Sequence, residues 1–197
     1  MNYLAHIFLS GNNEKLMIGN FIADSVKGEA WKTYDAEVKK GILLHRAIDT
    51  FTDTHEIVKE SKTRLWTRYR HYNAVIVDIF YDHFLAKNWK EYHPLDLNKF
   101  VEETYKKLNE HEEILPEQTK LFFKYMVEHN WLYNYQYIEG IKKVMGGMSR
   151  RTSFDSGMEN STEELVKYYD EFERDFNSFF PLLKKYVDAK INAGIQL

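Results

Sequence analysis

A histidine and an aspartate four positions apart offer the first chemistry in this sequence. His45 and Asp49 lie in the run Leu44–Asp53, whose apolar spacing is typical of a helix. Side chains at positions i and i+4 of a helix project from the same face, so this imidazole and this carboxylate can share a cation. An ordinary salt bridge has the same spacing, so the pair alone leaves both interpretations open.

A second set of polar residues interrupts a stretch that is otherwise apolar almost all round. Asp78, Asp82 and His83 stand in this stretch. Burying an ionised carboxylate is costly unless it is paired or coordinates a metal. Adjacent helical residues point about 100° apart, so Asp82 and His83 can converge on an ion placed between them. A structural network in which an aspartate pairs with Arg46 or Lys27 would account for the same residues without an ion.

Two further polar residues stand in apolar surroundings. His6 lies in the apolar start of the chain, and Asp24 ends the run Gly19–Asp24. A lone histidine in such a stretch is more often a hydrogen-bonded core residue than a ligand. Four apolar segments that each bring a histidine or an aspartate inwards would nevertheless converge in a helical bundle. Because the chain has no cysteine, we expect a metal site with only nitrogen and oxygen ligands.

The elements that must position these residues are helices. Helical periodicity runs along nearly the whole chain, and the alternation typical of strands is almost absent. We expect a compact all-α bundle of about eight helices, forming a single domain over residues 1–197. The expected helices cover residues 16–24, 36–51, 54–65, 74–89, 94–108, 116–126, 137–148 and 162 onward. Thr52–Thr54 is the expected break and N-cap between the second and third of these, and Ser149–Asn160 the expected longest loop.

Composition and charge exclude several classes of function. The absence of cysteine excludes a disulfide scaffold, a zinc ribbon and a thiol nucleophile. A net charge of -3 argues against wholesale binding of nucleic acid. No segment approaches the roughly 20 uninterrupted apolar residues that span a membrane, and the apolar start lacks the basic flank of a signal peptide. We therefore expect a cytoplasmic protein without membrane contact.

Several sequence blocks, taken together and in their order along the chain, resemble the acyl carrier protein phosphodiesterase family, also called holo-ACP hydrolase. The blocks are Asn2–His6, Gly19–Gly28, Gly41–Asp53, Asp78–Leu85, Trp131–Leu132 and Gly147–Arg151. The resemblance covers essentially the whole chain. It implies an HD-like all-α metal hydrolase that removes 4′-phosphopantetheine from holo-acyl carrier protein and uses Mn²⁺, with Mg²⁺ as a substitute.

The resemblance also implies roles for individual residues. The implied metal ligands are Asp24, His45, Asp82 and His83, and the further polar residues of the catalytic site are His6, Asp49 and Asp78. The order of the Asp82–His83 pair is the reverse of that in ordinary HD proteins, so their ligand geometry cannot be transferred directly.

Water is the expected nucleophile, because the chain has neither a cysteine nor a Gly-x-Ser-x-Gly elbow. Arg46, Arg150 and Arg151 can hold a phosphate by charge-assisted hydrogen bonds. A solvated loop is an equally open interpretation of Arg150 and Arg151.

Carrier proteins are small and acidic, so an enzyme that binds one should present a local positive face. Lys62, Arg64 and Arg68 are the predicted docking residues, and Lys142, Lys143, Arg150 and Arg151 form a second candidate group. Such cations also occur on the wet side of any amphipathic helix. Two other functions stay open: an HD-type phosphohydrolase of a nucleotide or other small phosphoester, and a non-catalytic helical binding module whose polar residues form buried salt bridges.

Overall fold

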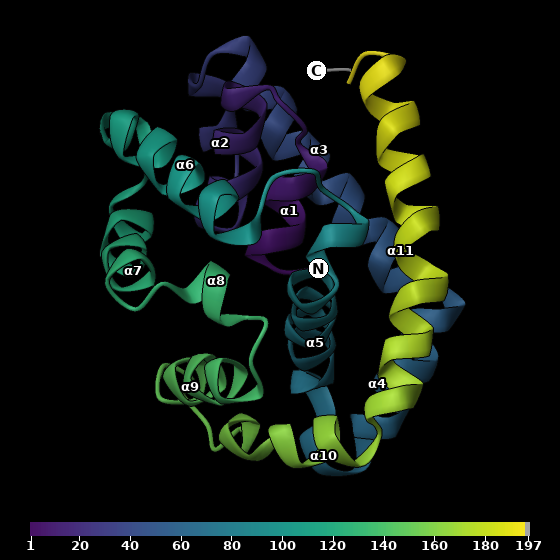
Figure 1. Ribbon diagram of the computed structural model, residues 1–197. Coiled ribbons are helices and arrows are strands. Elements are labelled where there is room, and N and C mark those ends of the chain that lie inside the picture. Colours follow the sequence, from purple (N-terminus) through teal and green to yellow (C-terminus); the bar gives the residue numbers. More distant parts are fainter. Residues whose placement is uncertain (196–197) are drawn as a thin grey trace.

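Helices make up all the regular structure of residues 1–195, the part of the chain that the computed structural model describes (Figure 1). The α-helices there are α1 (Tyr3–Leu9), α2 (Glu14–Ile22), α3 (Ala36–Thr54), α4 (Glu56–Tyr69), α5 (Asn73–Lys87), α6 (Leu97–Glu110), α7 (Glu117–Glu128), α8 (Trp131–Asn134), α9 (Ile138–Ser149), α10 (Thr162–Lys167) and α11 (Tyr169–Asn192). Short 3₁₀ turns cover Ala23–Ser25, Ala30–Thr33, Arg70–Tyr72, Trp89–Glu91, Glu112–Ile114 and Met158–Asn160. The predicted all-α class is confirmed.

The structure has three more α-helices in residues 1–195 than the eight expected. Two are the short helices α1 and α8, and the third arises because the last helix is divided at Tyr168, whose ψ of 34° interrupts it. The expected cap at Thr52–Thr54 is wrong: α3 continues to Thr54. The His55 ring accepts the N–H of Ile57 instead and begins α4.

Helix α5 lies in the middle of the molecule, as its nearly continuous apolar sequence indicates (Figure 1). Helix α11 runs along one side of α5, and α7, α8 and α9 lie on the other. The buried apolar side chains of these helices join in one core cluster. No helix within residues 1–195 combines the length and the apolar character needed to cross a membrane.

Helices α2 and α3 approach each other more closely than side chains would permit. A Cβ atom on Gly19 would lie 2.1 Å from the carbonyl oxygen of Val38, and one on Gly41 would lie 2.2 Å from that of Leu16. The two glycines therefore let the backbones meet. Their contact brings the backbone of Asn20, next to Gly19, within reach of His45, one turn after Gly41.

Candidate metal centre

Two histidines and one aspartate from helices α1 and α3 face one another at a cleft. His6 Nε2 lies 3.2 Å from one carboxylate oxygen of Asp49, and His45 Nε2 lies 3.0 Å from the other. The two imidazole rings are stacked, with centroids 3.9 Å apart. One potential ligand atom from each of the three residues lies within 4.8 Å of the other two. The predicted i, i+4 relation of His45 and Asp49 on one helix face is therefore present, and His6 joins them.

Asn20 of α2 orients both imidazole rings. Its side-chain nitrogen donates to the carbonyl of His6 (2.8 Å) and to Ser10 Oγ (2.9 Å), so its side-chain oxygen is left to accept from His6 Nδ1 (2.8 Å). Its backbone carbonyl accepts from His45 Nδ1 at 2.8 Å. Because both Nδ1 atoms donate, both Nε2 atoms point toward Asp49; the neutral His6 presents its lone pair there, and His45 does so once its Nε2 proton has left. The sequence pattern alone did not indicate a role for Asn20; the available signal was a side-chain amide inside the apolar run Gly19–Asp24.

The electrostatics keep His6 neutral and Asp49 ionised near neutral pH. Burial, followed by the neighbouring His45, lowers the pKa of His6 to about 4. Burial alone would raise the pKa of Asp49, but the hydrogen bond with His45, helped by the neighbouring His6 ring, holds it well below its usual range. Burial likewise opposes the charged form of His45, yet its bonds to Asp24 and Asp49 raise its pKa to about 9.

The donor set fits a divalent cation. His6 Nε2 is buried and has no hydrogen-bond partner, although a carboxylate oxygen of Asp49 lies 3.2 Å away. Two lone pairs that face each other at this distance repel unless a proton or a cation lies between them. Two imidazole nitrogens with carboxylate oxygens are ligands that Mn²⁺ and related ions accept.

Asp24 and Asp78 border the same cleft, which has a volume of about 320 Å³. The exposed Asp24 lies 3.1 Å from His45 Nε2, and their hydrogen bond lowers the pKa of its carboxyl. Asp78 accepts from the amino group of Met1 at 2.8 Å, and burial raises the pKa of its carboxyl. Both residues thus lie where the sequence analysis grouped them, with the histidines.

Asp82 lies apart from this cleft and holds the start of α1. Fully buried on α5, it accepts the backbone N–H groups of Leu4 (2.8 Å), Asn2 (3.2 Å) and Ala5 (3.4 Å). Burial raises the pKa of its carboxyl to about 7, although these hydrogen bonds oppose the shift. The prediction that Asp82 and His45 bind the same ion does not agree with this geometry, because both Asp82 oxygens are used by α1.

We therefore expect Asp82→Ala to lower stability rather than remove a ligand. The substitution leaves N–H groups of α1 buried without a partner, which costs about 1–3 kcal/mol. Denaturant unfolding of the variant measures this loss. Mn²⁺ binding should persist in the folded fraction. A variant that is as stable as the unaltered protein but binds no Mn²⁺ would restore Asp82 as a ligand.

His83 points to another part of the core. Its Nδ1 donates to the carbonyl of Tyr135, and its Nε2 lies 2.8 Å from the hydroxyl of Tyr169. Both ring nitrogens are thus engaged by α11 and by the segment after α8. The structure does not bring His83 to His45, so the predicted convergence of Asp82 and His83 with the Asp24–His45 pair does not occur.

The predicted phosphate-binding and docking cations lie outside the cleft. Arg46 is exposed and stacks on Trp31, with its guanidinium carbon 5.9 Å from the ring centre, whereas Arg150 and Arg151 border a neighbouring groove. The docking cations are ion-paired within the molecule: Lys62 with Asp53, Arg64 with Asp175, and Arg68 with Glu163 and Glu164.

Comparison with known proteins defines the family. The acyl carrier protein phosphodiesterase family matches residues 1–183. A protein of that name from Photorhabdus laumondii is 31% identical over 191 residues, which cover 96% of each chain. Another, from Klebsiella pneumoniae (strain 342), is 31% identical over 194 residues, covering 96% of this chain and 99% of the relative. No solved structure matches the chain.

The chain therefore belongs to the acyl carrier protein phosphodiesterase family, a family of enzymes.

Proposed function

We propose that this chain is a Mn²⁺-dependent phosphodiesterase that hydrolyses 4′-phosphopantetheine from holo-acyl carrier protein and leaves the apo form, with Mg²⁺ as a substitute cation. One observation carries the proposal: in a member of this family, two imidazole Nε2 atoms and the Asp49 carboxylate face one another at a cleft, with both Nδ1 atoms held by oxygens of Asn20.

In this proposal His6, His45 and Asp49 hold the cation, and Asp24 adds a carboxylate from the mouth of the cleft. When bound, the cation supplies Lewis acidity, which activates water and polarises a phosphoryl oxygen. The contacts with Asn20 hold the rings of His6 and His45 with Nε2 directed into the cleft, so the rings need not reorient when the ion binds and displaces the Nε2 proton of His45.

Asp78 is the proposed proton-exchanging group. It lines the cleft from α5, and its half-buried carboxyl has a raised pKa, which suits a group that takes a proton from water or returns one to a leaving oxygen. The serine oxygen of the carrier is the leaving group in the proposed reaction, and the phosphate departs with pantetheine.

Intact-mass measurement of holo-acyl carrier protein tests the proposed function. Incubation with the enzyme and Mn²⁺ should lower the carrier mass to that of the apo form, and a chelator should prevent the change. A panel of nucleotides serves as the comparison. Hydrolysis of a nucleotide with an unchanged carrier would favour the small-phosphoester alternative, and turnover of neither would favour the binding module.

A further inference from the structure

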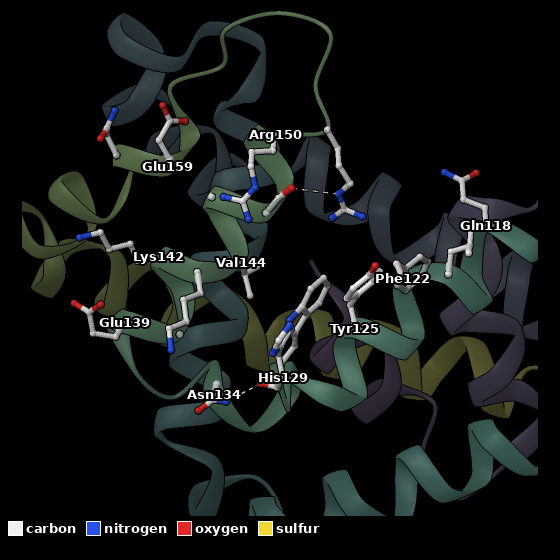
Figure 2. A pocket seen from close by; sticks show the side chains of 18 residues that line it. Gln118, Phe122, Tyr125, His129, Asn134, Glu139, Lys142, Val144, Arg150 and Glu159 are labelled. Atoms are coloured by element: carbon white, nitrogen blue, oxygen red, sulfur yellow. Dashed lines mark hydrogen bonds between the residues drawn. The ribbon is translucent and has the colours of Figure 1, made fainter.

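A wide groove of about 1150 Å³ lies beside the cleft, between α7, α8 and α9 (Figure 2). Gln118, Phe122 and Tyr125 of α7 stand on one side of it, and Glu139 and Lys142 of α9 on the other. Its volume exceeds the roughly 300–1,000 Å³ of small-molecule sites, and it is open to solvent. An open groove of this size can receive part of the surface of a partner protein.

The α7 wall presents large apolar side chains to solvent. Leu121 is 70% exposed and Tyr125 is 57% exposed, and they lie four residues apart on one face of α7. Neighbouring Phe122 and Trp131 also line the groove. Exposed apolar side chains gathered at a groove mark an interaction surface, and this spacing is the one that a partner helix contacts.

The opposite wall is basic. Lys142, Lys143, Arg150 and Arg151 are all exposed, and none forms an ion pair within residues 1–195. Of the two acidic residues in the groove, Glu159 accepts a hydrogen bond from Ser149. The groove therefore keeps unpaired positive charge. This distinguishes it from Lys62, Arg64 and Arg68, whose charges are already neutralised by acidic side chains of the same chain.

The groove borders the cleft. Tyr3 lines the cleft and Phe122 lines the groove, and their rings are in contact with centroids 5.3 Å apart. Met148 of α9 also lines the cleft, while Gly147 and Arg150 beside it line the groove. A protein seated in the groove would thus hold one of its edges next to His6 and His45.

We infer that this groove is the docking surface for an acidic, amphipathic face of the acyl carrier protein, which lays apolar side chains on α7 and carboxylates against α9. The inference rests on the proposed function. Charge complementarity selects the partner, and the position of the groove beside the cleft brings the carrier's modified serine near the reacting residues. The pantetheine arm is the other candidate occupant of the groove. Because apo-carrier has no arm, its binding to the groove reports contact with the carrier protein surface alone.

Binding of apo-acyl carrier protein, measured by calorimetry at low salt, tests the inference. The double substitution Lys142→Glu and Lys143→Glu should weaken binding about tenfold or more and reduce its salt dependence. Lys184→Glu with Lys185→Glu is the matched control, because this adjacent exposed pair lies on α11 and should leave the affinity unchanged. Leu121→Ser should also weaken binding, through lost apolar contact.

Parallel hydrolysis of bis(4-nitrophenyl) phosphate reports whether the cleft of each variant is intact. If the groove variants bind apo-carrier as tightly as the unaltered protein does, the inference is overturned. A raised KM for holo-carrier together with unchanged apo-carrier binding would likewise overturn it and would indicate that the groove binds the pantetheine arm. Loss of apo-carrier binding supports the docking surface even if no holo-carrier is hydrolysed, an outcome in which only the proposed function fails.

Discussion

Replacing His45 with alanine is expected to lower Mn²⁺-dependent turnover of holo-acyl carrier protein about a thousandfold, which corresponds to about 4 kcal/mol of transition-state stabilisation. The substitution removes the Nε2 atom that lies 3.0 Å from Asp49 and 3.1 Å from Asp24. With that ligand gone, the remaining donors cannot hold the cation in place. Steady-state kinetics with intact-mass detection of the apo form measure the loss.

His83→Ala is the matched control for this variant. It also deletes a buried imidazole, but one whose nitrogens contact Tyr135 and Tyr169 rather than the cleft. We expect His83→Ala to lower the unfolding temperature and to keep its turnover per folded molecule. Loss of turnover in the His83 variant with full activity in the His45 variant would show that the site lies on the other face of α5.

Replacing Asn20 with leucine is expected to weaken Mn²⁺ binding about 10- to 100-fold, the usual cost of losing a residue that orients a metal ligand. Leucine has a similar shape but offers no acceptor to His6 Nδ1. The backbone carbonyl of residue 20 still holds His45, so the effect should be smaller than that of the His45 variant. Calorimetric titration with Mn²⁺ gives the change in affinity.

Ser10→Ala is the control that separates loss of imidazole orientation from a general loss of the hydrogen bonds around Asn20. Ser10 Oγ accepts from Asn20 and donates to the carbonyl of His6, yet it does not touch either imidazole ring. This variant should lose stability but bind Mn²⁺ as the unaltered protein does. If Asn20→Leu binds Mn²⁺ as tightly as the unaltered protein does, the assigned role of Asn20 is contradicted.

Local periodicity made much of the fold and part of the site predictable. The i, i+4 spacing of His45 and Asp49 determines that they share a helix face, whatever the tertiary structure is. The apolar character of α5 on all sides likewise predicted its central position. Helix α1 was not expected, because its start depends on a carboxylate from α5, 78 residues away from Leu4.

The features of the site that the sequence did not predict depend on contacts between segments far apart in the chain. Burial of Asp82 does require compensation, as expected, but the sequence could not reveal that the compensating groups are N–H groups of α1 rather than a cation. Asn20 acquires its position from the close approach of Gly19 and Gly41, which only the packed helices display. The docking prediction at Arg64 overlooked Asp175, a partner 111 residues further along the chain.

Pulsed electron paramagnetic resonance of the Mn²⁺-loaded protein detects ¹⁴N nuclei of imidazoles bound to the ion, so it distinguishes a centre at His6 and His45 from one at His83. We predict a ¹⁴N coupling that persists in His83→Ala and that is weakened in both His6→Ala and His45→Ala. A coupling that disappears in His83→Ala and is unchanged in His45→Ala would place the ion beside Asp82 and contradict the proposed centre.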